Sequence, residues 1–461
     1  MSLLAKLRKP AHAGAGHDVT TIGDVLVVHA GDGGTEEARS LAASLPADPG
    51  HQVVVADLPP ESPVEAWQSL AAALPDGHRP VRLVPGRRPL YLGPHVGPWL
   101  AERIARPVLA PCGLVIESHA GLFVHYGPNT GWAWSRPGRA PEWAAKRFPR
   151  PAWESAEFAE VRALGAGAVV EPLPAGVWIR PGGPDGAFER GRVRLVRTVP
   201  CLLDAPTIVL GSPGLPGLDP AEVKEFWRAL PERMRATARF VGFGGLAVPG
   251  EAPFGQALAD VLGTPVLCCT GIPTGSPGVP DVFAVRRDGS HGWRPFAREI
   301  AYRPGDAQPR LCAHRAPIAG LPEVAPGVYR CAPDAVVEVV EAGLWIRPPG
   351  GASDVVTART TPLDPARNLV RYEAADPARA ERMRQVAESV IGRLDYPTRL
   401  VTELVPLVPP PAETPVGAVA EDSDGNAPLS PLTRPVSMPV SGPPLSRMAA
   451  RLAGIQDRET R

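Results

Sequence analysis

The sequence predicts an α/β protein of tandem duplicated three-layer modules with mainly parallel sheets, together with peripheral β-hairpins and a disordered C-terminal tail. Three observations indicate this fold: long internal repeats, short apolar segments that alternate with amphipathic ones, and a final stretch rich in proline and serine. The chain has 461 residues, which is enough for several domains that each bury a core.

Two repeats locate helices, strands and turns. Residues 100–113 read LAERIARPVLAPCG and residues 258–271 read LADVLGTPVLCCTG, which is the pattern of a helix that runs into a buried strand. A weaker match joins 123–132 to 283–293, where Gly and Asn or Asp stand between apolar residues. This match predicts a hairpin in each copy.

The most similar pair of segments contains a Trp-Ile-Arg-Pro motif. Residues 168–183 (AVVEPLPAGVWIRPGG) return at 335–350 (AVVEVVEAGLWIRPPG), and an Arg-Thr-x-Pro motif follows each copy, at 197–200 and 359–362. We expect each of these segments to add a peripheral antiparallel hairpin to its module. The beginning of the chain has no such motif, so the first module is expected to lack this hairpin.

The aligned repeats divide the chain into five parts. These are a flexible N-terminus (1–21), a first module (22–155), its duplicate (165–331), a truncated third module (335–408) and a Pro/Ser-rich tail (409–461). The tail has few aromatic residues and no periodicity, so it is expected to form no core of its own.

The duplicate shows the order of elements most clearly. Strands are expected at 207–212, 238–243 and 265–269, and helices at 220–231 and 253–263. Short apolar strands that alternate with helices are typical of right-handed crossovers and of a parallel sheet that is covered on both faces.

The composition narrows the classes of function. The 48 basic and 48 acidic residues balance, so we expect a protein as partner rather than nucleic acid. Neither a long apolar run nor a signal-peptide pattern occurs, so we expect no membrane span, and a cytoplasmic location or export without a classical signal peptide. The six cysteines lack CxxC spacing, and neither a metal nor a cofactor is expected.

A glycine-rich turn in the first module is a candidate nucleotide site. Gly31, Gly33 and Gly34 precede Thr35, which is expected to cap a helix, and Asp57 ends the next strand. Backbone N–H groups at such a helix start suit a phosphate, and the acid stands near the place of a ribose-binding residue. The spacing differs from GxGxxG, so an ordinary strand-to-helix turn is the competing interpretation.

Cys112 is the candidate nucleophile of a hydrolase. Adjacent strand ends of a parallel sheet meet at one edge, where this thiol is expected to approach His29, His119 or His125. The competing interpretation is a buried core cysteine, because the sister copy has Thr270 at the matching position.

The order of these motifs resembles a known family. A strand that ends in His29-Ala30-Gly31, the strand VRLVP at 81–85 and a helix that runs into PVLAPCG at 107–113 are similar to caspase-like cysteine peptidase domains of large actinobacterial toxin-type proteins. The resemblance covers residues 22–150 and 205–305. It implies an imidazole and a thiol at the carboxyl edge of the sheet.

The chain departs from the family pattern at the catalytic positions. After the strand at 81–84 it has Pro85-Gly86 where the peptidases have their nucleophile, and the second copy has Phe243-Gly244 there. The second copy also has Gly211 at the histidine position. The resemblance therefore implies degenerate modules.

Two aromatic groups are candidate binding surfaces. Trp178 and Trp345, with Arg180 and Arg347, are placed to contact a carbohydrate or a peptide, or else the indole packs across its hairpin and the guanidinium stacks on the ring. The basic and aromatic stretch at 132–153 suits single-stranded nucleic acid, but packing on the neighbouring module is the simpler interpretation.

The expected function is that of a non-catalytic interaction or scaffold protein, with an accessory role in a bacterial toxin or secretion system as the setting that the resemblance implies. One alternative is a cysteine-dependent, peptidase-like hydrolase that uses Cys112 and a nearby His. A second is a nucleotide-binding enzyme that uses the turn from Gly31 to Thr35.

Overall fold

The computed structural model describes residues 16–407, apart from 32, 119–120, 126, 128, 166, 249–251, 279, 307 and 351–354. The tail expected at 409–461 and most of the N-terminal segment lie outside the described residues. All described residues belong to one unit of the chain, which runs from Met1 to Pro410. In this described part, no helix is long and apolar enough to cross a membrane.

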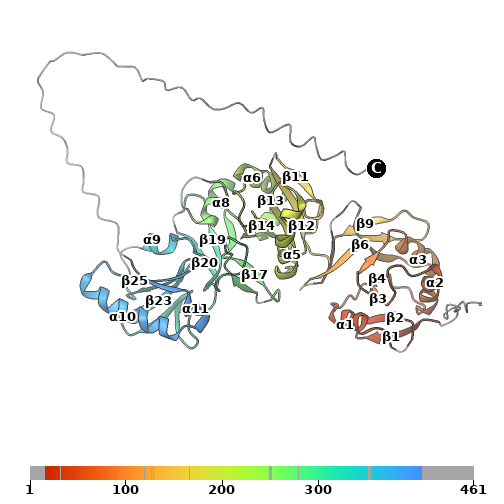
Figure 1. The fold of residues 1–461 in the computed structure, drawn as a ribbon, viewed down its shortest axis with the longest axis horizontal. Helices are drawn as coiled ribbons and strands as arrows, with labels where there is room; N and C mark the ends of the chain where they lie inside the picture. The colour runs from red at the N-terminus through yellow and green to blue at the C-terminus, as the bar shows by residue number, and fades with distance from the viewer. Residues whose placement is uncertain are drawn as a thin grey trace, which may run out of the picture. The chain divides into compact units, whose positions relative to one another are not determined.

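The protein is an α/β protein with several mixed sheets, each with a parallel core (Figure 1). The first sheet has the parallel strands β2 (Val25–His29), β3 (Gln52–Ala56), β4 (Val81–Pro85) and β6 (Val108–Ser118). The second has β13 (Gly176–Pro181), β14 (Thr207–Leu210), β15 (Arg239–Gly242) and β16 (Val266–Cys269). The third has β24 (Gly343–Arg347), β25 (Asn368–Glu373) and β26 (Thr402–Leu407).

Antiparallel strands flank each parallel core. The first core strand always pairs with the strand before it, which is β1 (Asp18–Ile22), β12 (Ala168–Leu173) or β23 (Ala335–Val340). The last core strand of the first two sheets continues into β8 (Gly131–Ser135) and β9 (Glu142–Ala145), or into β19 (Ala297–Tyr302) and β20 (Arg310–His314). Shorter strands complete the three sheets, namely β5 (Tyr91–Leu92), β7 (Gly121–Val124), β10 (Arg147–Phe148), β11 (Arg162–Leu164), β21 (Glu323–Ala325) and β22 (Val328–Ala332). Separately, β17 (Ile272–Thr274) pairs with β18 (Asp281–Phe283).

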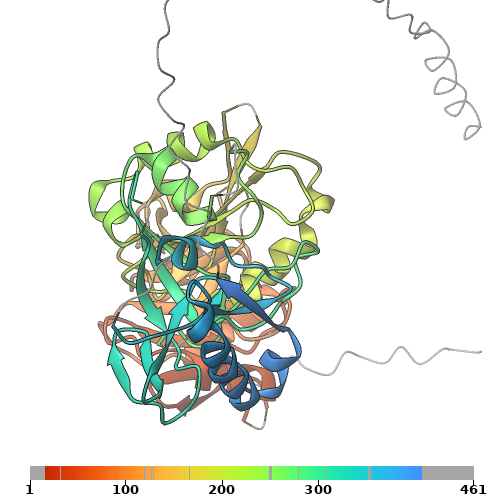
Figure 2. The ribbon, with the colours of Figure 1, turned by 90° about the vertical axis from the view of Figure 1, so that its left-hand side faces the viewer.

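Helices cover both faces of each sheet. One face packs against α1 (Glu36–Ser44), α5 (Glu189–Thr198) or α9 (Val355–Thr360). The opposite face packs against α2 (Val64–Ala73) and α3 (Val96–Ile104), against α6 (Pro220–Ala229) and α8 (Phe254–Leu262), or against α10 (Pro377–Arg393), the long helix in Figure 2. Short helices at η1 (Asp185–Ala187), α4 (Ala156–Ala159), α7 (Glu232–Thr237) and α11 (Tyr396–Leu400) join these elements.

The apolar core strands read as continuous runs because both of their faces are buried. In β2, Val27 lies in the same hydrophobic cluster as Leu41 of α1. The next residue, Val28, lies in a second cluster with Leu70 of α2. The alternation of side chains along a strand thus divides one apolar segment between two helical layers.

The five elements predicted for the duplicate are confirmed as β14, α6, β15, α8 and β16, to within one or two residues at each end. Local signals explain these bounds. The carboxylate of Asp219 accepts a hydrogen bond from the N–H of Ala221, and Pro220 fills the first position of α6. Gly263 ends α8 in the left-handed conformation, with a φ of 68°.

The structure differs from the prediction of peripheral Trp-Ile-Arg-Pro hairpins. β13 lies inside its sheet, antiparallel to β12 and parallel to β14, and β24 has the same place between β23 and β25. The first module has this hairpin too, because β1 and β2 pair in the same way. β1 begins at Asp18, so the part expected to be a flexible N-terminus (1–21) includes a strand.

Two further expectations differ from the structure. Within the segment expected as a hairpin at 123–132, β7 and β8 both pair with β6, while the matching segment at 283–293 does form a turn closed by a bridge between Val285 and His291. The third sheet begins before residue 335, because β21 and β22 add to β23. β21 is exposed along its length, so no buried apolar face marks this strand in the sequence.

Candidate functional site

The predicted nucleotide residues lie together, but they bind one another. The buried carboxylate of Asp57 accepts hydrogen bonds from the backbone N–H and hydroxyl of Thr35, at 2.7 and 2.8 Å, and from Nε of Arg87 at 2.6 Å. Burial alone raises the pKa of Asp57, but the bonds from Arg87 and Thr35 outweigh it and lower the pKa below its ordinary value. The N–H that a phosphate would use at this helix start is therefore bound to an internal carboxylate.

The glycines of this turn serve its shape. Gly31, Gly33 and Gly34 have φ values of 84°, 76° and 79°, which side-chain-bearing residues rarely adopt. A Cβ on Gly34 would lie 3.2 Å from both Asp57 and His29. Nucleotide binding by this turn remains a prediction, and the geometry itself describes a strand-to-helix turn closed by Asp57.

His29 is buried at the end of β2, and both of its ring nitrogens have partners. Nδ1 lies 2.8 Å from the carbonyl oxygen of Gly31, and Nε2 lies 2.8 Å from the hydroxyl of Thr20 on β1. A carbonyl only accepts, so Nδ1 donates to Gly31 and a neutral ring accepts at Nε2 from the hydroxyl.

Cys112 lies on β6, opposite Gly131 of β8. Two strands, β3 and β4, separate β6 from β2, so three strand spacings place the thiol roughly 14 Å from the strand that bears His29. Burial raises the pKa of Cys112, and the nearby ammonium of Lys146 offsets this only in part. His125 directly follows β7, and His119 lies outside the described residues. The structure thus does not bring Cys112 and His29 together, and the hydrolase alternative remains a prediction.

The Trp-Ile-Arg-Pro motifs form buried ionic clusters instead of open binding surfaces. Trp178 is fully buried beneath α5, and its Nε1 donates to the carbonyl oxygen of Gly211 at 2.7 Å. Glu171 binds Arg180 at 2.9 Å and Arg192 at 2.5 Å. The third module repeats this cluster with Trp345 fully buried and with Glu338 bound to Arg347 and Arg359.

The basic and aromatic stretch at 132–153 is also largely internal. Arg147 is buried, forms an ion pair with Glu154 and donates hydrogen bonds to the carbonyl oxygens of Phe158, Leu173 and Gly176. The bonds to Leu173 and Gly176 fix the start of the second sheet to the end of the first. This contact agrees with the simpler interpretation, packing between modules.

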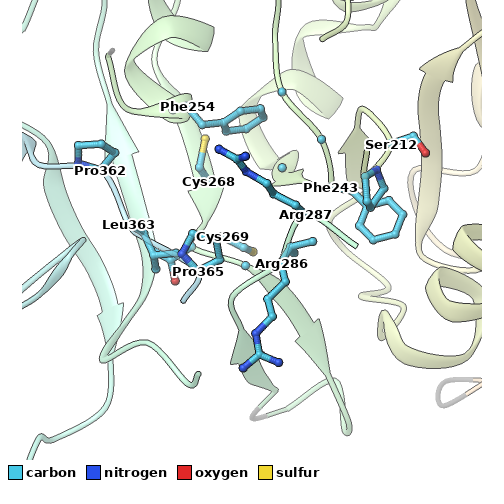
Figure 3. A pocket seen from close by; sticks show the side chains of 18 of the residues that line it. Ser212, Phe243, Phe254, Cys268, Cys269, Arg286, Arg287, Pro362, Leu363 and Pro365 are labelled. Atoms are coloured by element: carbon cyan, nitrogen blue, oxygen red, sulfur yellow. The ribbon is translucent and has the colours of Figure 1, made fainter. Parts of the chain in front are cut away.

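A crevice of about 550 Å³ lies where the carboxyl ends of β14, β15 and β16 meet (Figure 3). In open α/β sheets this edge is where ligands bind. The segments that follow the three strands line it, with Ser212 after β14, Phe243 after β15 and Thr270 after β16.

Two glycines allow the first two of these segments to touch. A Cβ on Gly211 would lie 2.7 Å from the backbone of Gly244, and one on Gly244 would lie 2.4 Å from the amide nitrogen of Ser212. Gly211 also has a φ of 80°. Larger residues at either position would separate the loops and deform this wall of the crevice.

Two adjacent arginines stand at the rim. Arg286 and Arg287 belong to the turn that the bridge between Val285 and His291 closes, and both are exposed. Figure 3 shows the side chain of Arg287 crossing the crevice toward Phe254, whereas that of Arg286 points away. Among the described residues, no carboxylate lies within ion-pair distance of either guanidinium.

The floor of the crevice contains titratable groups whose pKa values burial raises. Burial raises the pKa of Cys268 well above its ordinary value and that of Cys269 to about 12. Burial also raises the pKa of Tyr302 well above its ordinary value and that of Glu341 to about 7. Protonated thiols and phenols are poor nucleophiles, so this arrangement suits binding better than covalent catalysis.

The remaining walls are apolar and come from two modules. Phe243, Phe254 and Leu215 belong to the second module, and Leu363 and Pro365 belong to the third. A ligand in the crevice would therefore contact apolar surface on both sides and a cation at the rim.

Sequence reasoning missed this crevice. Arg286 and Arg287 lie in the segment 283–293, which was expected only as a hairpin, and Glu341 stands inside the repeated segment 335–350, in the turn between β23 and β24. One difference between the two copies could have indicated the crevice. The first module has the carboxylate of Asp57 at the end of a strand, and the second module has Gly211 at the matching position.

Comparisons of this chain with protein-family models, with curated proteins and with solved structures find no match. Across the described ranges, no group of three or more His, Cys, Asp or Glu side chains is placed to hold a metal ion.

Proposed function

We propose that this chain is a non-catalytic interaction protein and that the crevice of the second module is its binding site for an anionic group with an apolar body. The observation that carries the proposal is Arg287, which lies across an apolar crevice at the carboxyl edge of a parallel sheet and has no carboxylate partner among the residues that the structure describes. A guanidinium in such a place is suited to carboxylate, phosphate or sulfonate oxygens.

In the first module, the arginine at the same edge of the sheet has a carboxylate partner within the chain. There, Asp57 follows β3 and binds Arg87, which follows β4. By strand register Gly211 of the second module stands where Asp57 stands in the first, so the second module has no internal anion at this position. An external anion supplies the missing charge.

The size and lining of the crevice support a ligand larger than a simple ion. About 550 Å³ lies within the range of small-molecule sites, which bind mostly through apolar contacts and a few placed polar groups. Phe243 and Phe254 give flat apolar contacts, and Arg287 gives the orienting charge.

The resemblance to degenerate caspase-like modules supports binding over catalysis. Strand register places Arg180, and not Gly211 as expected, at the position of His29 in the second module, and Phe243-Gly244 follow the strand that matches VRLVP. Neither an imidazole nor a thiol therefore stands at these positions, and Phe243 and Gly244 line the crevice. We infer that a former catalytic edge serves here as a binding edge, in an interaction or scaffold role of the kind that the family resemblance implies.

Fluorescence titration with anilinonaphthalene sulfonate, an aromatic anion, tests the proposal. We expect one bound probe per chain. Arg287→Ala is expected to weaken its binding about tenfold or more, since a hydrogen bond to a charged group contributes about 1.5–3 kcal/mol. Arg228→Ala removes the same charge from the exposed side of α6 and is expected to leave the affinity unchanged.

Phenylnaphthylamine, the same ring system without the sulfonate, separates charge recognition from apolar contact. Its affinity is expected to be equal in the wild type and in Arg287→Ala. Equal sulfonate affinity for the wild type and Arg287→Ala would overturn the proposal.

A further inference from the structure

Glu341 brings a carboxyl group into the floor of the crevice. It lies in the tight turn between β23 and β24, is 8% exposed and belongs to the third module, whereas most of the crevice belongs to the second. Its Oε2 accepts a hydrogen bond of 2.7 Å from the hydroxyl of Tyr302 on β19. Gly255 makes room for this tyrosine, because a Cβ there would lie 2.1 Å from the ring.

We propose that Glu341 couples ligand binding to proton binding, so that the crevice takes up a proton with its anionic ligand and releases both as the pH rises. This inference rests on the proposed function, since it concerns the same crevice and the same class of ligand. It assigns the third module a role in the site, because the group that senses pH comes from that module.

The surroundings of Glu341 favour its neutral form. Burial dominates and raises its pKa to about 7, while hydrogen bonds from Tyr302 and from the backbone N–H of Leu363 reduce the rise. On the crevice side Cys268 of β16 and Tyr302 of β19 face it, and burial keeps both protonated near neutral pH. Arg287 lines the same crevice from the rim.

On its other side Glu341 lines a second cavity of about 350 Å³. The charged groups there are Glu338 of β23, Arg347 of β24, Arg359 of α9 and Arg310 of β20. Glu338 binds Arg347 and Arg359, so two of these cations already have an anionic partner. Burial and the two hydrogen bonds, rather than any of these charges, decide the pKa of Glu341.

The direction of the coupling follows from charge. Below pH 7 Glu341 is mainly neutral and does not repel a bound anion, whereas above pH 7 its carboxylate places a negative charge in the same crevice. A bound anion disfavours this second charge, so it raises the pKa of Glu341, and by linkage a rise in pH weakens binding of the anion.

Sulfonate-probe titrations at pH 6 and pH 8.5 test this inference, because the sulfonate stays ionised at both. The wild type is expected to lose about tenfold in affinity, as for one unit of ligand-induced pKa shift. Glu341→Gln keeps an oxygen that accepts from Tyr302 and is expected to hold nearly the same affinity at both pH values.

Tyr302→Phe provides a second variant. Its loss removes a hydrogen bond that lowers the pKa of Glu341, so the fall in affinity is expected to move to higher pH. Equal pH dependence in the wild type and Glu341→Gln, or none in the wild type, would overturn the coupling and leave the binding proposal standing. Failure of the sulfonate to bind at either pH would instead remove the binding proposal on which the coupling depends.

Discussion

His29, Arg180 and Arg347 stand at the same position, the fifth residue of the second strand in the opening hairpin. In the second and third modules this position carries an arginine that binds a glutamate on the neighbouring strand. In the first module the matching pair is His29 with Thr20 at 2.8 Å. The first module thus keeps the cross-strand contact, but as a hydrogen bond to a hydroxyl in place of an ion pair. This contact gives His29 a structural role in closing the hairpin.

The raised pKa of Glu341 also predicts how the stability of the protein depends on pH. The pKa of this carboxyl is 4.5 in the unfolded chain and about 7 in the folded one. Between these values the folded state binds the extra proton, so the free energy of unfolding falls as the pH rises and stays at the reduced level above about 7. At about 1.4 kcal/mol per unit, the loss from this group is roughly 3 kcal/mol.

Urea denaturation at pH 5 and pH 8 measures this effect. Glu341→Gln has no carboxyl to titrate, so it is expected to be more stable than the wild type at pH 8 and to show a smaller change between the two pH values. A variant that loses as much stability as the wild type between these pH values would show that Glu341 does not hold its proton.

Thiol labelling distinguishes the two interpretations of Cys112. Burial raises its pKa, so alkylation by iodoacetamide at pH 7.5 is expected to be slower than at Cys312, the exposed cysteine. Peptide mapping of the labelled protein gives both rates in one experiment. Faster labelling of Cys112 than of Cys312, with a midpoint below the free value of about 8.5, would support the hydrolase alternative.

Single residues were the hardest to predict from the sequence. Asp57 was correctly placed beside the glycine turn, but its partner Arg87 is distant in the sequence and no local pattern indicates the pair. The same holds for Tyr302 and Glu341, which come from different modules. Local patterns carry information about periodicity and turns, whereas side-chain pairing across strands depends on the register of the finished sheet.

At the scale of elements, the opening hairpin is held by a buried ionic cluster. Glu171 is the shared buried partner of Arg180 and Arg192, so Glu171→Ala removes the buried carboxylate from two largely buried guanidinium groups, whereas their ion pairs with Asp185 and Glu189 are to exposed carboxylates. We expect a loss of about 3 kcal/mol in the free energy of unfolding, since removal of one member of a buried pair typically costs 3–5 kcal/mol.

Urea denaturation of Glu171→Ala, with Glu225→Ala on the exposed side of α6 as the control, checks this value. The equivalent change Glu338→Ala is expected to act in the same direction in the third module, where Arg347 and Arg359 lose their partner. If Glu171→Ala proved as stable as the control, the cluster would not hold the hairpin.

Helices and strands with a strong hydrophobic periodicity could be predicted from the sequence, whereas the opening hairpin of the first module could not. The strand–helix–strand order of the second module follows from apolar runs and helix caps, and it is confirmed. The strand that ends at His29 was predicted, but β1 and its pairing with β2 were not. Thr20 and His29 replace the Glu and Arg that mark the later copies, so the repeated motif is absent from the first module although the strand pairing is the same. A search for repeated residues therefore finds fewer of the equivalent hairpins than a comparison of strand register does.

For the whole molecule, Arg147 joins the first and second sheets through several polar contacts. Its guanidinium satisfies Glu154 and the carbonyl oxygens around the turn that begins β13. Arg147→Ala is expected to cost about 3–5 kcal/mol, because it leaves Glu154 buried without its cation.

Arg139→Ala, an exposed arginine in the same stretch, is the matched control for this prediction. Limited proteolysis of the two variants is expected to show faster cleavage between the first and second sheets only in Arg147→Ala. Equal cleavage patterns would mean that apolar packing alone holds this junction.

The modular plan accounts for the place of the proposed binding site. The first module fills its carboxyl edge with Asp57 and Arg87, whereas the second leaves glycines there and places Arg287 above them. The third module contributes Glu341 to the floor and apolar residues to one wall. The two modules therefore differ at this edge: the first is closed by its own side chains, and the second is where we propose that a ligand binds.

The most direct test of this account is a crystal structure of the chain with bound anilinonaphthalene sulfonate. We expect the sulfonate within hydrogen-bond distance of the Arg287 guanidinium, with the rings between Phe243 and Phe254. A probe bound elsewhere, with the crevice of the second module empty, would contradict it.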